Sequence, residues 1–346
     1  MVNKVKSDMV PYTYARVSAM RSKLIARSEY QKLLKMDLTS ITRYLQEAGY
    51  KEIIELSDKF SGIELVDQAL KENQVETFHK LRKISPQNMV DVINLYLCRW
   101  DYYNLKIVLR GLFSNISKEE TMELIIDAGN YNREHFAKLF DTSSIWEAIA
   151  NSKFVSEKEM QEAYESFKNT RKLIELENKL DQLSFKKAVS GAGICPDQGH
   201  IFKRFLLRDI DIINIKNILR FKKEGLEHSV IMDYMIFSGL RLKKKDLESL
   251  AKRETIKDVL EALNKTYYSR FIDFTGFDDL YDIEIALQNI NLKSSSLKAH
   301  QNPLSIAAVL NYMISKIIEV RNLRSIVKSK HLGIDENYVE KKLLVV

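Results

Sequence analysis

Apolar residues recur at helical spacing along this chain, most clearly in three segments that share one pattern. Each segment has the order acidic-x-x-Asn-apolar-basic-x-apolar-apolar-basic, and the three copies are DYYNLKIVLR (101–110), DIINIKNILR (211–220) and EVRNLRSIVK (319–328). Counted from the asparagine, positions −12, −8, −4, +1, +4 and +5 are apolar in every copy. At 3.6 residues per turn these positions fall on one broad face, so each copy predicts a long amphipathic helix.

The same spacing extends to proline residues and indicates an internal repeat. The asparagines of the three segments lie 110 and 108 residues apart: Asn104, Asn214 and Asn322. A proline precedes them by 18, 18 and 19 residues: Pro86, Pro196 and Pro303. Proline suits a helix start, because its missing N–H has no intrahelical partner there. The sequence therefore predicts three similar units of about 110 residues, which we place at 1–117, 118–226 and 227–346.

The remaining sequence favours an all-α fold. Shorter amphipathic stretches lie between the long segments, and breaks are expected near 114–117 and 222–225. Only 11 glycines and 4 prolines occur in 346 residues, so turns are few and periodic segments long. Residues 190–199 (SGAGICPDQG) are the most loop-like stretch, and no region of the sequence has the pattern of β-strands.

Within its apolar face, each long segment carries an acidic residue and an asparagine one turn apart. These pairs are Asp101 with Asn104, Asp211 with Asn214, and Glu319 with Asn322. A buried polar pair is costly unless it is hydrogen-bonded, so we expect each pair to fix helix register or to hold a neighbouring backbone. The alternative is a catalytic acid, but a catalytic acid has no reason to occur three times at repeat spacing.

Basic residues at +2 and +6 lie toward the opposite side of each helix. Most of them, including Arg110, Arg220 and Lys328, are expected to form a solvated face, with a ring of polar contacts as the alternative. The net charge of +7 permits an acidic partner without requiring one. Nucleic-acid binding is disfavoured, because the basic clusters have acidic neighbours such as Glu224 and Asp246 and lack interleaved stacking aromatics.

No catalytic, cofactor or metal motif is found. The chain lacks a phosphate-binding loop, its six histidines have no metal-ligand spacing, and Cys98 and Cys195 cannot make a disulfide framework. The longest apolar run has five residues, 306–310, far fewer than the ~20 of a membrane-spanning helix. The first residues, MVNKVKSDMVPY, have no apolar core of a secretory signal, so a cytoplasmic location is expected.

Four ordered segments carry a family resemblance. YARVSAMRSKLI (14–25), WDYYNLKIVLRG (100–111), DIINIKNILRFKKEG (211–225) and VRNLRSIVKSKHLGI (320–334) resemble the C subunit of archaeal and bacterial A/V-type rotary ATPases, which is related to the d subunit of eukaryotic V-ATPases. The resemblance covers essentially the whole chain. It implies three helical units arranged as a pseudo-threefold funnel.

The resemblance also implies a function. Such a protein is a non-catalytic part of the central stalk, held at the cytoplasmic face of the membrane. Its expected partners are the central-shaft subunits and the membrane proteolipid ring, between which it transmits torque linked to ATP synthesis or hydrolysis and to H⁺ or Na⁺ transport. Arg110, Arg220 and Lys328 are candidates for contact with one of these subunits. No cofactor, small-molecule substrate or nucleic acid is expected. The alternative is a free-standing helical-repeat scaffold that binds an acidic protein or nucleic acid.

Overall fold

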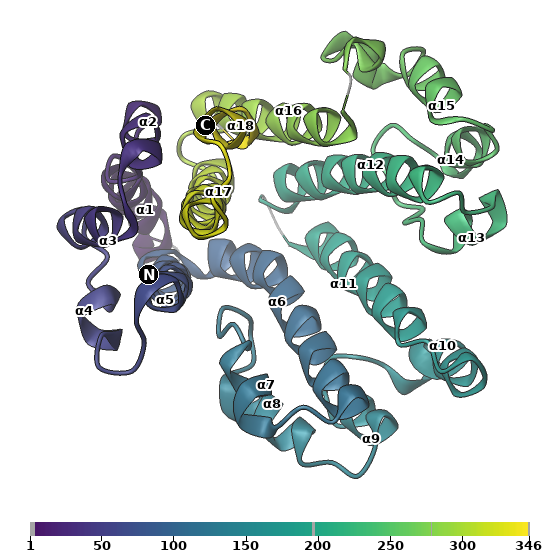
Figure 1. The fold of residues 1–346 in the computed structure, drawn as a ribbon, viewed down its shortest axis with the longest axis horizontal. Coiled ribbons are helices and arrows are strands. Elements are labelled where there is room, and N and C mark those ends of the chain that lie inside the picture. The colour runs from purple at the N-terminus through teal and green to yellow at the C-terminus, as the bar shows by residue number, and fades with distance from the viewer. Residues whose placement is uncertain (1–3, 196–197, 278, 345–346) are drawn as a thin grey trace. The chain divides into compact units, whose positions relative to one another are not determined.

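The computed structural model describes residues 4–195, 198–277 and 279–344, and within these ranges every regular element is a helix (Figure 1). The predicted all-α fold is therefore confirmed. The chain divides into two compact units, one formed by residues 1–90 with 254–346 and the other by 91–253.

The unit of residues 91–253 contains most of the first long helix and the whole of the second. Its core joins the second half of α6 to α8–α11, with Leu105, Phe136 and Leu180 fully buried at the centre. Its helices are α6 (Gln87–Ser114), α7 (Lys118–Glu123), α8 (Arg133–Phe140), α9 (Ile145–Ala150), α10 (Glu157–Thr170), α11 (Ile174–Ile194), α12 (Gly199–Lys223), α13 (His228–Asp233) and α14 (Lys244–Ala251).

The other unit is assembled from N-terminal and C-terminal segments of the chain. The long helix α17 packs against α1, α5 and α16, and α18 packs against α2 (Figure 1). The elements are α1 (Lys4–Arg21), α2 (Arg27–Lys35), α3 (Leu38–Glu47), α4 (Glu52–Leu56), α5 (Gly62–Ile84), α15 (Ile256–Leu263), the 3₁₀ turns η1 (Tyr267–Arg270) and η2 (Phe274–Gly276), α16 (Leu280–Gln301), α17 (Ile306–Leu332) and α18 (Glu336–Lys342).

The three predicted long helices are confirmed as α6, α12 and α17. The predicted apolar positions are buried in each helix, except that Trp100 and Ile314 are half-buried. Pro86 lies immediately before α6, and Ser305, two residues after Pro303, caps α17 by accepting the Ala307 amide at 3.2 Å. The third proline, Pro196, lies outside the described residues.

Each long helix also ends in the same way, and the first two end near the predicted breaks at 114–117 and 222–225. The residue at +11 from the repeat asparagine has a left-handed backbone: Asn115 (φ 52°), Gly225 (φ 72°) and Gly333 (φ 63°). The next amide then donates to the carbonyl five residues earlier, at 3.0 Å in every copy: Ile116 to Gly111, Leu226 to Phe221 and Ile334 to Ser329. This hydrogen bond defines a Schellman cap, for which glycine or asparagine is preferred because left-handed φ strains most other residues.

The loop predicted at 190–199 is wrong for its first half, because α11 continues to Ile194. Gly191 serves packing rather than a turn. A Cβ on Gly191 would lie 2.4 Å from Cδ2 of Leu95, so the absence of a side chain lets α11 approach α6. Composition alone predicts a helix break at Gly191. The structure shows instead that close packing between two helices requires a glycine there.

Two core clusters each contain the apolar positions +1, +4 and +5 of a long helix but are otherwise assembled differently. The cluster beneath α6 uses residues between 102 and 183, whereas the cluster beneath α17 uses residues 320–343 together with residues 30–70. The compact units consequently do not follow the predicted divisions at 117 and 226, since N-terminal helices complete the core of α17. The three-unit division stays a prediction.

Candidate functional site

The three repeat asparagines clamp the backbone of a segment that follows each long helix. Each side chain donates from Nδ2 to a main-chain carbonyl and accepts the amide of that same residue at Oδ1. The partners are Ile126 for Asn104 (2.7 and 3.0 Å), Ile236 for Asn214 (2.8 and 3.0 Å) and Leu344 for Asn322 (2.7 and 3.1 Å). All three asparagines are at most 2% exposed. Their polar atoms therefore satisfy buried backbone groups that would otherwise be costly.

The acidic residues of the first two pairs hold backbone amides as well. Asp101 and Asp211 each accept from two successive amides about 30 positions further along the chain. The donors are Asn130 and Tyr131 to Asp101 (2.8 and 3.1 Å), and Arg241 and Leu242 to Asp211 (2.7 and 3.2 Å). Both carboxylates thus tie a loop to a long helix.

A glycine makes each of these contacts possible. A Cβ at Gly129 would lie 2.0 Å from Oδ1 of Asp101, and a Cβ at Gly239 would lie 1.9 Å from Oδ1 of Asp211. Burial raises the pKa of Asp101 to about 6, and its hydrogen bonds from the loop oppose that effect. A buried carboxylate that accepts from a fixed loop fits a structural role in both copies.

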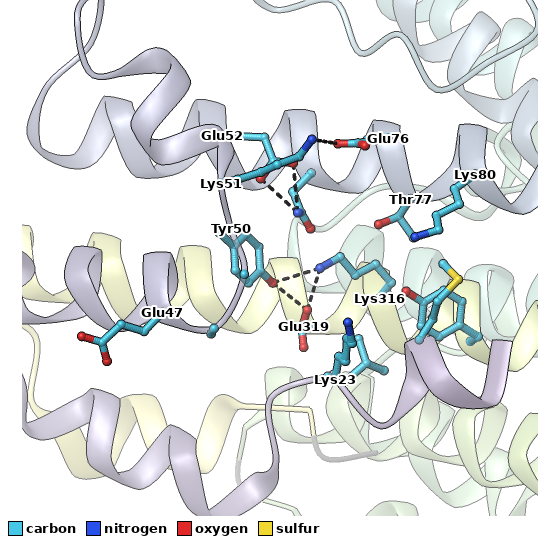
Figure 2. Close-up of a pocket in the computed structure, with 16 residues that line it drawn as sticks. Lys23, Glu47, Tyr50, Lys51, Glu52, Glu76, Thr77, Lys80, Lys316 and Glu319 are labelled. Carbon is cyan, nitrogen blue, oxygen red and sulfur yellow. Dashed lines mark hydrogen bonds and ion pairs between the residues drawn. The ribbon is translucent and has the colours of Figure 1, made fainter. Parts of the chain in front are cut away.

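The third acidic residue, Glu319, is bound differently. Its Oε2 accepts the Ile25 amide at 2.6 Å, and its Oε1 accepts the Tyr50 hydroxyl at 2.6 Å and Nζ of Lys316 at 2.7 Å. Lys316 also donates to the Tyr50 oxygen at 3.0 Å, and its ammonium lies 4.4 Å from the centre of the Tyr50 ring. Figure 2 shows this closed triangle of lysine, tyrosine and glutamate. Lys316 is only 5% exposed, so its charge is compensated inside the protein.

Tyr50, Lys316 and Glu319 line a pocket of about 470 Å³. Its walls come from the end of α1, the α3–α4 connection, α5 and α17. The polar lining residues labelled in Figure 2 are Lys23, Glu47, Tyr50, Lys51, Glu52, Glu76, Thr77, Lys80, Lys316 and Glu319. The pocket lies entirely within the unit that joins the N-terminal and C-terminal segments.

The pKa shifts of Tyr50 and Glu52 agree with a fixed hydrogen-bond network in this pocket. Burial, then the nearby Glu319 charge, raise the pKa of Tyr50 well above its usual range. Tyr50 is therefore a hydroxyl donor at neutral pH. Burial also raises the pKa of Glu52, whose carboxylate accepts from Nδ2 of Asn73 at 3.0 and 3.2 Å.

Sequence reasoning identified Glu319 but missed Lys316, Tyr50 and the pocket. One signal was available, because Lys316 is three residues before Glu319 and lies on the same apolar side of the predicted helix. Tyr50 comes from a distant segment, and no spacing in the sequence connects it to α17.

The basic residues predicted as possible contacts with another subunit are all exposed but differ in their partners. Arg110 donates to both carboxylate oxygens of Glu177, at 2.6 and 2.8 Å. Arg220 also has an interaction partner, whereas Lys328 has no acidic partner among the described residues. A role of these three residues in binding another subunit stays a prediction.

The described residues include neither an activated thiol at Cys98 nor a metal-ligand cluster. Cys98 is buried, and burial raises its thiol pKa to about 11, so the thiol is neutral at physiological pH. Over the described ranges, no three His, Cys, Asp or Glu side chains are placed to hold a metal ion. None of the described helices combines the length and apolar character needed to span a bilayer.

The fold is thus that of an all-helical protein whose three long helices repeat one buried asparagine clamp. A family model described as "ATP synthase (C/AC39) subunit" matches residues 13–342, and the chain belongs to this family. Membership makes it a non-catalytic subunit of a rotary ATPase.

Similar proteins support this assignment. The chain is 31% identical to the C subunit of the A-type ATP synthase of Methanococcoides burtonii, over 98% of this chain and 95% of that protein. It is 32% identical to the corresponding protein of Methanosarcina barkeri, with 97% and 93% covered. It is 30% identical to that of Haloferax volcanii, with 97% of both chains covered.

Proposed function

We propose that this chain is the socket of the central stalk, which links the rotating shaft to the proteolipid ring of an A-type ATP synthase. In this role it transmits torque between ATP synthesis or hydrolysis and the movement of H⁺ or Na⁺. It is held peripherally at the cytoplasmic face of the membrane through the complex. The relatives, each named as the C subunit of an A-type ATP synthase, support this assignment to the complex.

The structural observation that carries the proposal is the threefold recurrence of cap and clamp along the long helices. A coupler must resist twisting, and a helix whose end and following segment are both hydrogen-bonded to it is stiff. Close-packed interiors transmit strain with little compression. The apolar faces of α6, α12 and α17 are almost wholly buried, which suits a load-bearing body.

The proposed shape is a funnel of three similar units. Three copies of one helical module give three similar surfaces, a suitable basis for a body that rotates with a shaft. The similar core clusters beneath α6 and α17 support equivalent modules. They also favour modules that begin at a long helix, with N-terminal helices completing the module of α17.

A pull-down from detergent-solubilised membranes, with the tagged chain as bait, tests the function. We expect shaft subunits and proteolipid to be recovered together in an ATP-hydrolysing complex. Recovery of the bait alone, or with nucleic acid, would instead favour the free-standing scaffold.

The predicted basic contacts need a control for the internal ion pair of Arg110. Charge reversal at Lys328 (K328E) tests an exposed residue with no described acidic partner. R110Q should be compared with E177Q, which breaks the same ion pair but keeps the positive charge of Arg110. Loss of shaft or ring binding in R110Q and K328E, but not in E177Q, would support contact through these charges. Unchanged binding in all three variants would exclude it.

A further inference from the structure

The pocket beside Glu319 lies where the third long helix departs from the arrangement kept by the other two. Asp101 and Asp211 are each covered by a glycine-containing loop that supplies two backbone amides. Glu319 receives one described backbone amide, from Ile25, and its other partners are the side chains of Tyr50 and Lys316. A clamp that is closed in two copies therefore borders an open, polar cavity in the third.

Hydrogen-bond donors converge on this cavity. Lys316 directs two of its three N–H bonds to Tyr50 and Glu319, which leaves one for a further acceptor. Lys23 and Lys80 line the same cavity, and neither has an acidic partner among the described residues. Two unpaired lysines, together with the Lys316 that Glu319 compensates, therefore line one cavity.

Glu319 compensates the charge of Lys316, whereas the other acidic side chains of the pocket form no described ion pair with Lys23 or Lys80. Glu76 pairs with Lys51 at 3.4 Å, and Glu52 is held by Asn73. In Figure 2, Glu47 lies on the opposite side of the pocket from Lys80 and points away from the lysines. The uncompensated positive charge at this end is therefore that of Lys23 and Lys80, beside the Lys316–Glu319 ion pair.

We propose that this end of the pocket binds an oxyanion group, either a carboxylate or a phosphate. Ammonium donors make short, charge-assisted hydrogen bonds to such oxygens. A partly enclosed pocket makes these hydrogen bonds stronger than they are in bulk water. The cavity of about 470 Å³ is large enough for the anion and its remaining water. The anion comes from an acidic side chain of a partner protein or from a free inorganic ion. The binding site belongs to this chain alone and does not depend on the proposed rotor role.

The first experiment uses inorganic phosphate with the isolated chain, at constant ionic strength maintained with sodium chloride. Thermal unfolding and calorimetry should show a saturable rise in Tm of about 2 °C in the wild type. The variant K23Q/K80Q changes only exposed side chains at the cavity wall, so it should fold normally and bind phosphate at least tenfold more weakly. The control K257Q/K265Q removes the same charge from exposed positions outside the pocket and should behave as the wild type.

The proposal is overturned if phosphate acts no differently from sodium chloride, or if K23Q/K80Q retains full phosphate binding. The membrane pull-down then identifies the source of the anion. Weaker recovery of the other ATPase subunits with K23Q/K80Q, and release of the wild type by added phosphate, would indicate a carboxylate from a partner. Unchanged recovery together with phosphate binding would indicate a free anion. Failure of the rotor role would appear only in the pull-down, so the two proposals are tested separately.

Discussion

The side-chain amide of Asn322 holds both backbone groups of Leu344, donating to its carbonyl at 2.7 Å and accepting its amide at 3.1 Å. Asn104 and Asn214 make the same pair of bonds 22 residues further along in their own copies. One buried side chain thus fixes the path of the chain after each long helix.

Replacing a clamp asparagine with alanine should destabilise the protein. N104A and N214A each leave a buried amide and carbonyl without their partner, which should lower the free energy of unfolding by about 2–4 kcal/mol. Chemical denaturation measures this change. N217A is the control, because Asn217 lies three residues after Asn214 on α12, is half-buried and has no described hydrogen bond. A loss in N104A or N214A no larger than that of N217A would contradict the clamp role.

The glycines that face the aspartates should not tolerate a methyl group. G129A and G239A place a Cβ about 2 Å from a carboxylate oxygen, so the loop must move and its amides leave the carboxylate. We expect each to cost more than about 2 kcal/mol of unfolding free energy. G193A is the matched control. Gly193 lies within α11, and its Cβ would meet only Nζ of Lys203, at 3.9 Å. It should be neutral or stabilise the protein by up to about 1 kcal/mol. Equal behaviour of G129A and G193A would show that the loop adapts freely.

The sequence predicts best those features whose residues all lie within one segment. The long helices and the buried positions of Asp101 and Asn214 follow from local spacing, because helical periodicity places these residues on the apolar face. The same reasoning failed at Gly191, since its role depends on Leu95 of another helix. A glycine can mark either a helix break or a close contact between two helices, and only the neighbouring helix shows which of these applies.

The pocket could not be predicted because its residues come from segments far apart in the chain. Tyr50 and Lys316 are 266 residues apart, and neither belongs to a known motif. The N-terminal helices that complete the core of α17 do not carry the asparagine pattern. Their pairing is determined by packing over a long sequence separation, which periodicity does not encode.

Asp101 should make stability depend on pH in an identifiable window. Its pKa is about 6 in the folded protein and 3.8 when unperturbed, so between these values the folded state holds one more proton than the unfolded state. The free energy of unfolding should therefore fall as pH rises from about 4 to 6, by about 3 kcal/mol at about 1.4 kcal/mol per pKa unit. Comparing urea denaturation of the wild type and D101N at pH 4.5 and 6.5 isolates this contribution. Identical pH dependence in the two proteins would contradict it.

The ion pair between Lys316 and Glu319 should show strong energetic coupling. E319Q removes the only described carboxylate bonded to a buried ammonium, which should cost about 3–5 kcal/mol of unfolding free energy. K316M should cost less, because Glu319 keeps the Ile25 amide and the Tyr50 hydroxyl as donors. In K316M/E319Q no uncompensated charge remains, so the double variant should be more stable than the sum of the single losses predicts, by about 1–3 kcal/mol. Denaturant unfolding of the four proteins completes the cycle, and strictly additive losses would mean that the two charges do not interact.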